Sequence, residues 1–235
     1  MTQNLFESIY KRLLFESSLA NTENLAACVF PEEGTYEAVL YNVENAKKHL
    51  TSSVLRELSP EILIQFKITV GMIQIAKPPT TIGRCYDAWE VVTVAGPGYG
   101  DILYAIAYAL SPSKLLILDR SSVSDKAYTS WRRESGGREK FPLDDFDDPK
   151  TVPTVDDCTV YKDERSDVLD HAYKAQEWEK SMLAQLRGNH AKFVREMERK
   201  TPSFDQEDFL NHLKWSSVRF FREKFLPKKR ISDDY

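Results

Sequence analysis

The chain has 235 residues and a formal net charge of −4, from 32 Lys and Arg against 36 Asp and Glu. Hydrophobic residues make up 42% and charged residues 29%, which is a globular composition and excludes a disordered chain. This length buries a sizeable core without disulfide or metal staples, and the net charge excludes a polycation, so any nucleic-acid surface must be local.

The N-terminus, MTQNLFESIYKRLLFESS, carries acidic residues inside its apolar pattern, unlike a signal peptide. No stretch approaches about 18 uninterrupted apolar residues, so we expect no transmembrane helix and no membrane partner. The three cysteines, Cys28, Cys85 and Cys158, are too far apart for a CxxC zinc site, and free thiols suit a reducing compartment. We therefore expect a soluble cytoplasmic protein.

The first predicted elements are two helices and a short strand. Apolar residues recur at helical spacing over residues 4–18, which predicts an amphipathic helix. Residues 36–41 (YEAVLY) predict a strand. Residues 42–58 predict a second helix, with Asn42 or Asn45 as its cap and Pro60 as its stop.

Two strands are predicted next. Apolar residues alternate over 62–70, which is the period of a strand with one buried face, and the strand is expected to run on to residue 76. Gly71 marks a bulge or bend there. Residues 87–94 (DAWEVVTV) predict the second strand.

A strand–loop–helix–strand–helix unit follows. After the turn AGPGYG, residues 101–110 are apolar nearly all round and predict a buried helix. Residues 115–118 (LLIL) predict a strand in the middle of a sheet, and Ser124 is expected to cap a further helix. The crossover implies a parallel pair of strands.

The last third of the chain changes in character. Residues 138–166 are polar and contain the acidic run DDFDD, which predicts an extended wrap with one strand at 159–161. From residue 167 the pattern predicts helices to the end. We therefore predict an α/β (α+β) core domain over 1–161 and a helical C-terminal extension over 162–235.

The glycine turn at residues 95–101 is the most informative segment for chemistry. Gly98 and Gly100 have no side chain to block an anion from the backbone, and the helix that follows presents unpaired N–H groups. A Walker loop needs Lys-Ser/Thr after its last glycine, which is absent here. The glycines read GxGxG instead of the GxGxxG of dinucleotide-binding folds.

The stretch Ala95-Gly96-Pro97-Gly98-Tyr99-Gly100-Asp101-Ile102-Leu103 resembles the Q/R-x-x-G-x-G/A-x-x-L signature of the GNAT superfamily, the Gcn5-related N-acetyltransferases. Ser124, Ala127 and Trp131 stand at the spacing of that family's N-x-x-A-x-x-x-Y. The resemblance covers about residues 60–137. It implies a mixed central sheet flanked by helices, with loop amides that hold the pyrophosphate of acetyl-CoA.

This resemblance implies an acetyl-CoA-dependent N-acetyltransferase that acts on an unidentified amine. Its cofactor-binding residues would be Val92, Val94, Ala95, Gly96, Gly98, Tyr99, Gly100, Asp101 and Ser124. Acyl transfer also needs a base and a proton donor. Glu90 is the candidate base, with Asp87 second; Tyr128 is the candidate acid, because Trp131 occupies the usual Tyr position and an indole N–H is a poor acid.

Alternatives to an acetyltransferase stay open. The sequence also resembles GNAT-like proteins encoded by bacteriophages, and this resemblance implies host cytoplasm or a virion as its location. The chain would then be a non-catalytic scaffold, an assembly protein or a partner-binding protein, with its C-terminal helices as the contact. The basic, aromatic-rich residues 219–230 allow nucleic-acid binding. Neither the acidic run nor the four scattered histidines predicts a metal site.

Overall fold

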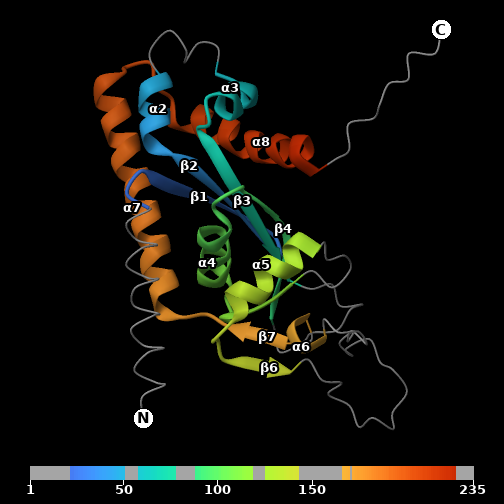
Figure 1. Ribbon diagram of the computed structural model, residues 1–235. Coiled ribbons are helices and arrows are strands. Elements are labelled where there is room, and N and C mark those ends of the chain that lie inside the picture. Colours follow the sequence, from blue (N-terminus) through green and yellow to red (C-terminus); the bar gives the residue numbers. More distant parts are fainter. Residues whose placement is uncertain are drawn as a thin grey trace, which may run out of the picture.

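The computed structural model describes residues 22–50, 58–77, 88–118, 125–142, 166–169 and 171–225 (Figure 1). Within these residues the chain forms a seven-stranded open sheet in the order β1-β2-β3-β4-β5-β7-β6. Only β4 and β5 are parallel; every other neighbouring pair is antiparallel. The fold is therefore a mixed α+β fold around one sheet.

The first four strands form a meander. They are β1 (Leu25–Glu32), β2 (Thr35–Asn42), β3 (Thr69–Ala76) and β4 (Trp89–Ala95). A tight turn joins β1 to β2, and Gly34 adopts a φ of 71° there. The remaining strands are β5 (Leu115–Leu118), β6 (Lys140–Pro142) and β7 (His171–Lys174).

Helices fill the connections and the C-terminal third. The short ones are α2 (Val43–His49), α3 (Pro60–Gln65) and α6 (Ser166–Leu169). The longer ones are α4 (Gly100–Leu110), α5 (Asp125–Ser135), α7 (Glu177–Lys200) and α8 (Gln206–Phe225). No helix among the described residues is long and apolar enough to cross a membrane.

The sheet has a core on each face because its strands alternate between them. The front face carries Ala27, Leu40 and Ile73 and packs against α4, α5 and the first half of α7. The back face carries Ala26, Val39 and Tyr41 at its β1–β2 side and packs against α2, α3, α8 and the second half of α7. Figure 1 shows α7 running beside β1, at the edge of the sheet.

Helix α7 contributes to both cores as it passes that edge. Met182 and Leu186 are buried in the front core, whereas Phe193 and Met197 are buried in the back core. Between them, Asn189 donates hydrogen bonds from Nδ2 to the backbone oxygens of Thr22 (3.1 Å) and Leu25 (2.8 Å). A helix that covers the edge strand in this way protects it from pairing with another chain.

Several sequence predictions are confirmed. The strands at 36–41 and 115–118 are present, as are the buried helix at 101–110 and the parallel pair that the crossover implied. The strand predicted at 87–94 corresponds to β4, which begins at Trp89. Residue 87 lies outside the described residues. Asn42 caps α2 by accepting a hydrogen bond from the backbone N–H of Asn45 (2.8 Å).

Other predictions are wrong. Residues 62–65 are helical: Ser59 caps α3, and Pro60 begins that helix rather than only stopping the one before it. The strand β1 was not predicted, although LAACVF is a continuous apolar run. The C-terminal region is not helical throughout, because β7 lies inside the sheet between β5 and β6. The helix predicted at 4–18 and the strand at 159–161 lie outside the described residues.

Candidate functional site

The glycine turn joins the end of β4 to the start of α4. The backbone N–H of Tyr99 donates to the Gly96 oxygen (2.9 Å), which closes the turn, and Leu103 N–H donates to Tyr99 oxygen (3.0 Å), which opens the helix. Gly98 has a φ of 84°, a conformation that glycine adopts without strain. The turn therefore depends on glycine at position 98.

The three glycines of the turn have different structural roles. A Cβ at Gly96 would lie 2.6 Å from Leu103 Cδ1 and 3.1 Å from Gly71 Cα, so Gly96 lets α4 pack against β3. A Cβ at Gly98 or Gly100 would meet no atom within 4 Å. Gly98 and Gly100 therefore leave open space in front of the turn, whereas Gly96 is a packing residue.

The N-terminus of α4 has no side-chain cap. Tyr99 is its N-cap residue and makes no capping hydrogen bond. The first backbone N–H groups of a helix have no acceptor within it and carry the positive end of its dipole. Asp101 in the first turn pairs with Arg133 of α5, with 2.5 Å between Oδ1 and Nη2, so a guanidinium lies beside this helix end.

β4 is irregular just before the turn. Gln74 of β3 pairs with Thr93 and Ile75 pairs with Val91, so Val92 is an extra residue in the strand, and its side chain is 42% exposed. On the other side, the pairing of β4 with β5 is described only from Trp89 to Val91. β4 therefore runs past its described pairing with β5, and the chain that follows Leu118 of β5 lies outside the described residues.

The two predicted catalytic residues point to different faces of the sheet. Glu90 is 6% exposed and pairs with Ile117, whose side chain lies in a small back-face cluster with Ala88 and Ala172. Tyr128 of α5 is half-buried against the front core. The sheet therefore lies between these two side chains. Asp87 and Ser124 lie outside the described residues.

Trp131, at the position of the family's usual Tyr, is a core residue. It is fully buried, with ring centroids 5.5 Å from Tyr104, 5.9 Å from Tyr108 and 5.6 Å from Tyr173. Its Nε1 has no hydrogen-bond partner among the described residues. This side chain fills the space between α4, α5 and β7, and its buried indole N–H is too weak an acid to protonate a departing thiolate.

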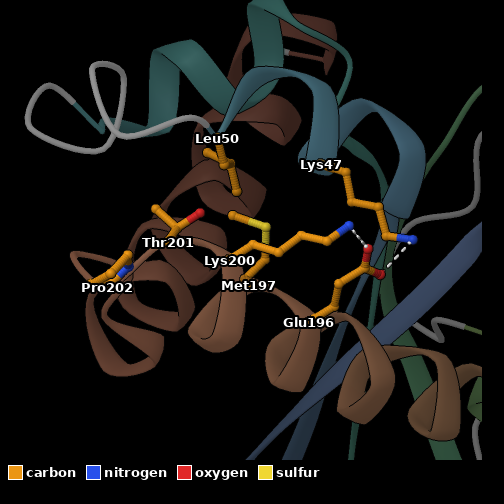
Figure 2. A pocket seen from close by; sticks show the side chains of 7 residues that line it. All are labelled: Lys47, Leu50, Glu196, Met197, Lys200, Thr201 and Pro202. Carbon is orange, nitrogen blue, oxygen red and sulfur yellow. Dashed lines mark hydrogen bonds and ion pairs between the residues drawn. The ribbon is translucent and has the colours of Figure 1, made fainter.

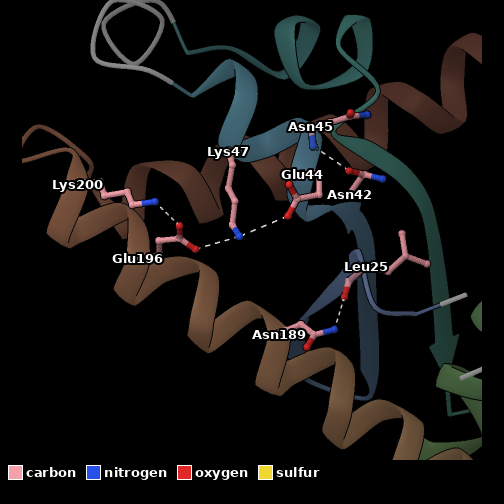
Figure 3. Close-up of polar contacts among 8 residues, drawn as sticks. All are labelled: Leu25, Asn42, Glu44, Asn45, Lys47, Asn189, Glu196 and Lys200. Carbon is pink, nitrogen blue, oxygen red and sulfur yellow. Dashed lines mark hydrogen bonds and ion pairs between the residues drawn. The ribbon is translucent and has the colours of Figure 1, made fainter. Parts of the chain in front are cut away.

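A separate pocket of roughly 400 Å³ lies between the C-terminal ends of α2 and α7 (Figure 2). Leu50 and Met197 form its apolar side. The carboxylate of Glu196 lies between two lysines, 2.9 Å from Lys47 Nζ and 2.6 Å from Lys200 Nζ (Figures 2 and 3). These two hydrogen bonds lower the pKa of Glu196 to about 2. No predicted site residue lines this pocket.

Cysteine and histidine side chains meet at one place in the described part of the chain. His190 Nδ1 lies 2.8 Å from Tyr41 Oη and 3.3 Å from Cys28 Sγ. Burial raises the pKa values of Cys28 and Tyr41 and lowers that of His190, so all three are neutral near pH 7. Among the described residues, no three His, Cys, Asp or Glu side chains are placed to hold a metal ion.

Sequence reasoning missed two features of the site. Arg133 was not singled out, because its partner Asp101 lies 32 positions away and only the packing of α5 beside α4 joins them. The separate role of Gly96 was also missed, since a glycine pattern does not distinguish packing from ligand approach.

No protein-family model, curated protein or solved structure matches the chain.

Proposed function

We propose that the chain binds acetyl-CoA at the glycine turn and transfers its acetyl group to an amine, as a GNAT-like acetyltransferase. The observation that carries this proposal is one juxtaposition. The open turn at Gly98 and Gly100 precedes an uncapped helix end and directly follows the strand segment with the exposed bulge at Val92. In acetyl-CoA the diphosphate would bind at the open turn and helix end, and the thioester would lie beside the strand segment, so one ligand would use both features.

The residues present fit such a cofactor. The backbone N–H groups of Gly98 and of residues 100–102 would hold the diphosphate, because the Tyr99 N–H already donates to Gly96 oxygen. The ion pair with Arg133 would offset the Asp101 carboxylate, which would otherwise repel the diphosphate. Val92 and Val94, on the segment of β4 past its described pairing with β5, would present backbone groups to the acyl carbonyl. Bound acetyl-CoA would supply the activated acetyl group.

The chain's own acid–base groups would act from the two faces. Glu90, from the back face, would take a proton from the acceptor ammonium so that a neutral amine attacks. Tyr128, from the front face, would give a proton to the departing thiolate, so that free thiol leaves. Both roles require a gap between β4 and β5 beyond Val91, at which the acceptor and the thioester would meet, and this gap is part of the proposal.

The cofactor site can be tested by calorimetric titration of acetyl-CoA into the wild type and Gly100→Glu. Position 100 has open space and an ordinary φ, and a carboxylate in the first turn of a helix favours folding, so this variant should stay folded while repelling a diphosphate. Gly188→Glu in α7 is the matched control, because a Cβ there also meets no atom within 4 Å. We expect saturable binding that only Gly100→Glu abolishes; no binding by the wild type would reject the proposal.

A non-catalytic scaffold is the second candidate. Two features favour it. Trp131 lies in the core where an acid would be needed, and Glu90 and Tyr128 lie on different faces, whereas catalysis needs an acid and a base at one substrate. It predicts that the chain binds a protein partner or itself without turning over acetyl-CoA. Release of free CoA in the presence of a panel of primary amines, lost in Glu90→Gln, would exclude it.

A further inference from the structure

The pocket between the C-terminal ends of α2 and α7 has no part in the proposed acetyl transfer. Its volume of roughly 400 Å³ falls within the range of about 300–1,000 Å³ that is common for ligand pockets. On its apolar side, Leu50 and Met197 are 1% and 4% exposed and belong to the back core, so the pocket opens onto the edge of that core. It therefore combines an apolar wall with the charged rim of Glu196 and its two lysines (Figure 2).

The charged rim has a defined arrangement (Figures 2 and 3). Lys200 Nζ lies 2.6 Å from Oε1 of Glu196 and Lys47 Nζ lies 2.9 Å from Oε2, so each lysine contacts a different oxygen of one carboxylate. This carboxylate brings together two ammonium groups that come from different helices. Lys47 also lies 3.4 Å from Glu44 Oε1. An ammonium group has three N–H donors, so each lysine has at least one more to give to a ligand.

The pocket carries a net positive charge. Its charged lining residues, among those that the structure describes, are two lysines and one glutamate. The hydrogen bonds from these lysines hold the pKa of Glu196 far below its ordinary value, as a positive environment does for a carboxylate. The last turns of both helices are basic, with Lys47 and Lys48 in α2 and Arg199 and Lys200 in α7, which offsets the negative end of each helix dipole. The charge that complements this pocket is therefore negative.

We propose that this pocket binds a small organic acid, with its carboxylate on Lys47 and Lys200 and its apolar body against Leu50 and Met197. Since a water-sized group takes about 30 Å³, the pocket suits a ligand of about a dozen non-hydrogen atoms. An inorganic anion leaves the apolar wall unused, and an organic amine meets two like charges. This inference is independent of the acetyltransferase proposal, because the two sites share no residue.

The test is a calorimetric titration of phenylbutyrate, a carboxylate of suitable size, into the full chain. We expect saturable binding with a dissociation constant of about a millimolar, as is usual for a ligand this small. Phenylbutylamine has the same apolar body with an ammonium group and should bind at least about tenfold more weakly. Lys47→Met and Lys200→Met each remove one ammonium group but keep an unbranched side chain, and each should weaken phenylbutyrate binding about fivefold.

Lys180→Met is the matched control, because Lys180 pairs with Glu177 at 3.2 Å near the opposite end of α7 and the change in charge is the same. It should bind phenylbutyrate as the wild type does, and thermal unfolding checks that all three variants are folded. Absent saturable binding, equal affinity for the amine, or wild-type affinity in both pocket variants would each overturn the proposal. So would an equal loss in Lys180→Met, since the overall charge of the chain would then determine the binding.

Discussion

The two halves of α7 are held in opposite ways. The first half begins at a buried ion pair: Arg138 Nη2 lies 2.5 Å from Glu179 Oε1, both side chains are almost inaccessible, and the guanidinium lies 3.8 Å from the centre of the Tyr108 ring. The second half packs Phe193 against Tyr41 and Phe209 and keeps its ion pairs at the surface. Variants along this helix therefore compare how three kinds of contact affect the free energy of unfolding. These are a buried ion pair, the neutral cluster around His190 and an exposed ion pair.

The largest expected effect comes from removing everything after residue 161, which takes away β7, α7 and α8 together. The predicted boundary after residue 161 would make 1–161 an independent domain, but β7 lies between β5 and β6, and α7 supplies side chains to both cores. We expect a chain ending at residue 161 to lose cooperative thermal unfolding, with exposed apolar surface that binds a hydrophobic dye. A chain ending at residue 225 is the control and should unfold cooperatively. A cooperative transition in the shorter chain would establish two domains.

The buried pair should give the largest effect of a single substitution. Glu179→Ala removes the carboxylate that pairs with the buried Arg138 guanidinium, and with it the hydrogen bond that Gln176 N–H donates to close the α7 capping box (2.6 Å). We expect a loss of about 4 kcal/mol in the free energy of unfolding, measured by urea denaturation. Burial raises the pKa of Glu179 more than Arg138 lowers it, so desolvation is the larger influence on this carboxyl.

Two variants sharpen this result. Glu177→Ala changes an exposed carboxylate two positions away, which pairs with Lys180 at 3.2 Å, and should cost less than about 0.5 kcal/mol. Replacing both partners, Arg138→Met with Glu179→Leu, should recover much of the stability because no charge is left buried. A double variant as unstable as Glu179→Ala would mean that the capping box, not the unpaired charge, determines the effect.

The His190 cluster should make stability depend on pH. Burial lowers the pKa of His190 below its ordinary 6.5, so the unfolded chain binds a proton that the folded chain does not. Stability should therefore fall as pH drops through about 6.5 and level off below the folded pKa. Tyr41 and Cys28 stay neutral in this range because burial raises their pKa values, and the charge of Arg187 acts on Cys28 only in the opposite, smaller sense.

His190→Gln isolates this contribution. Its amide oxygen can still accept from Tyr41, but it cannot take up a proton. The wild type should gain stability relative to the variant as the pH rises from 5 to 7, and lose it again as the pH falls. A constant difference across that range would show that His190 keeps its ordinary pKa in the folded protein.

Local signals predicted the elements but not how they combine. The turn at Gly98, the buried α4 and the β4–β5 parallel pair follow from patterns within about 30 residues, where glycine, apolar periodicity and the crossover rule act. The pairing of β5 with β7 joins residues almost 60 positions apart through four-residue strands, too short to show a period. The α3 error has a similar cause, because ILIQF alternates like a strand while the Ser59 cap favours a helix.

The smallest expected effect is at the exposed end of α7. Glu196 bridges Lys47 of α2 and Lys200, but its side chain is 29% exposed, so solvent and salt screen both pairs (Figure 3). We expect Glu196→Gln to cost about 1 kcal/mol or less near pH 7. Because the folded pKa is about 2 and the ordinary value is 4.5, the wild-type advantage should persist above pH 4.5 and disappear as pH falls toward 2. Urea denaturation at low and high salt measures it, and a cost near that of Glu179→Ala would mean that this carboxylate is as desolvated as the buried pair.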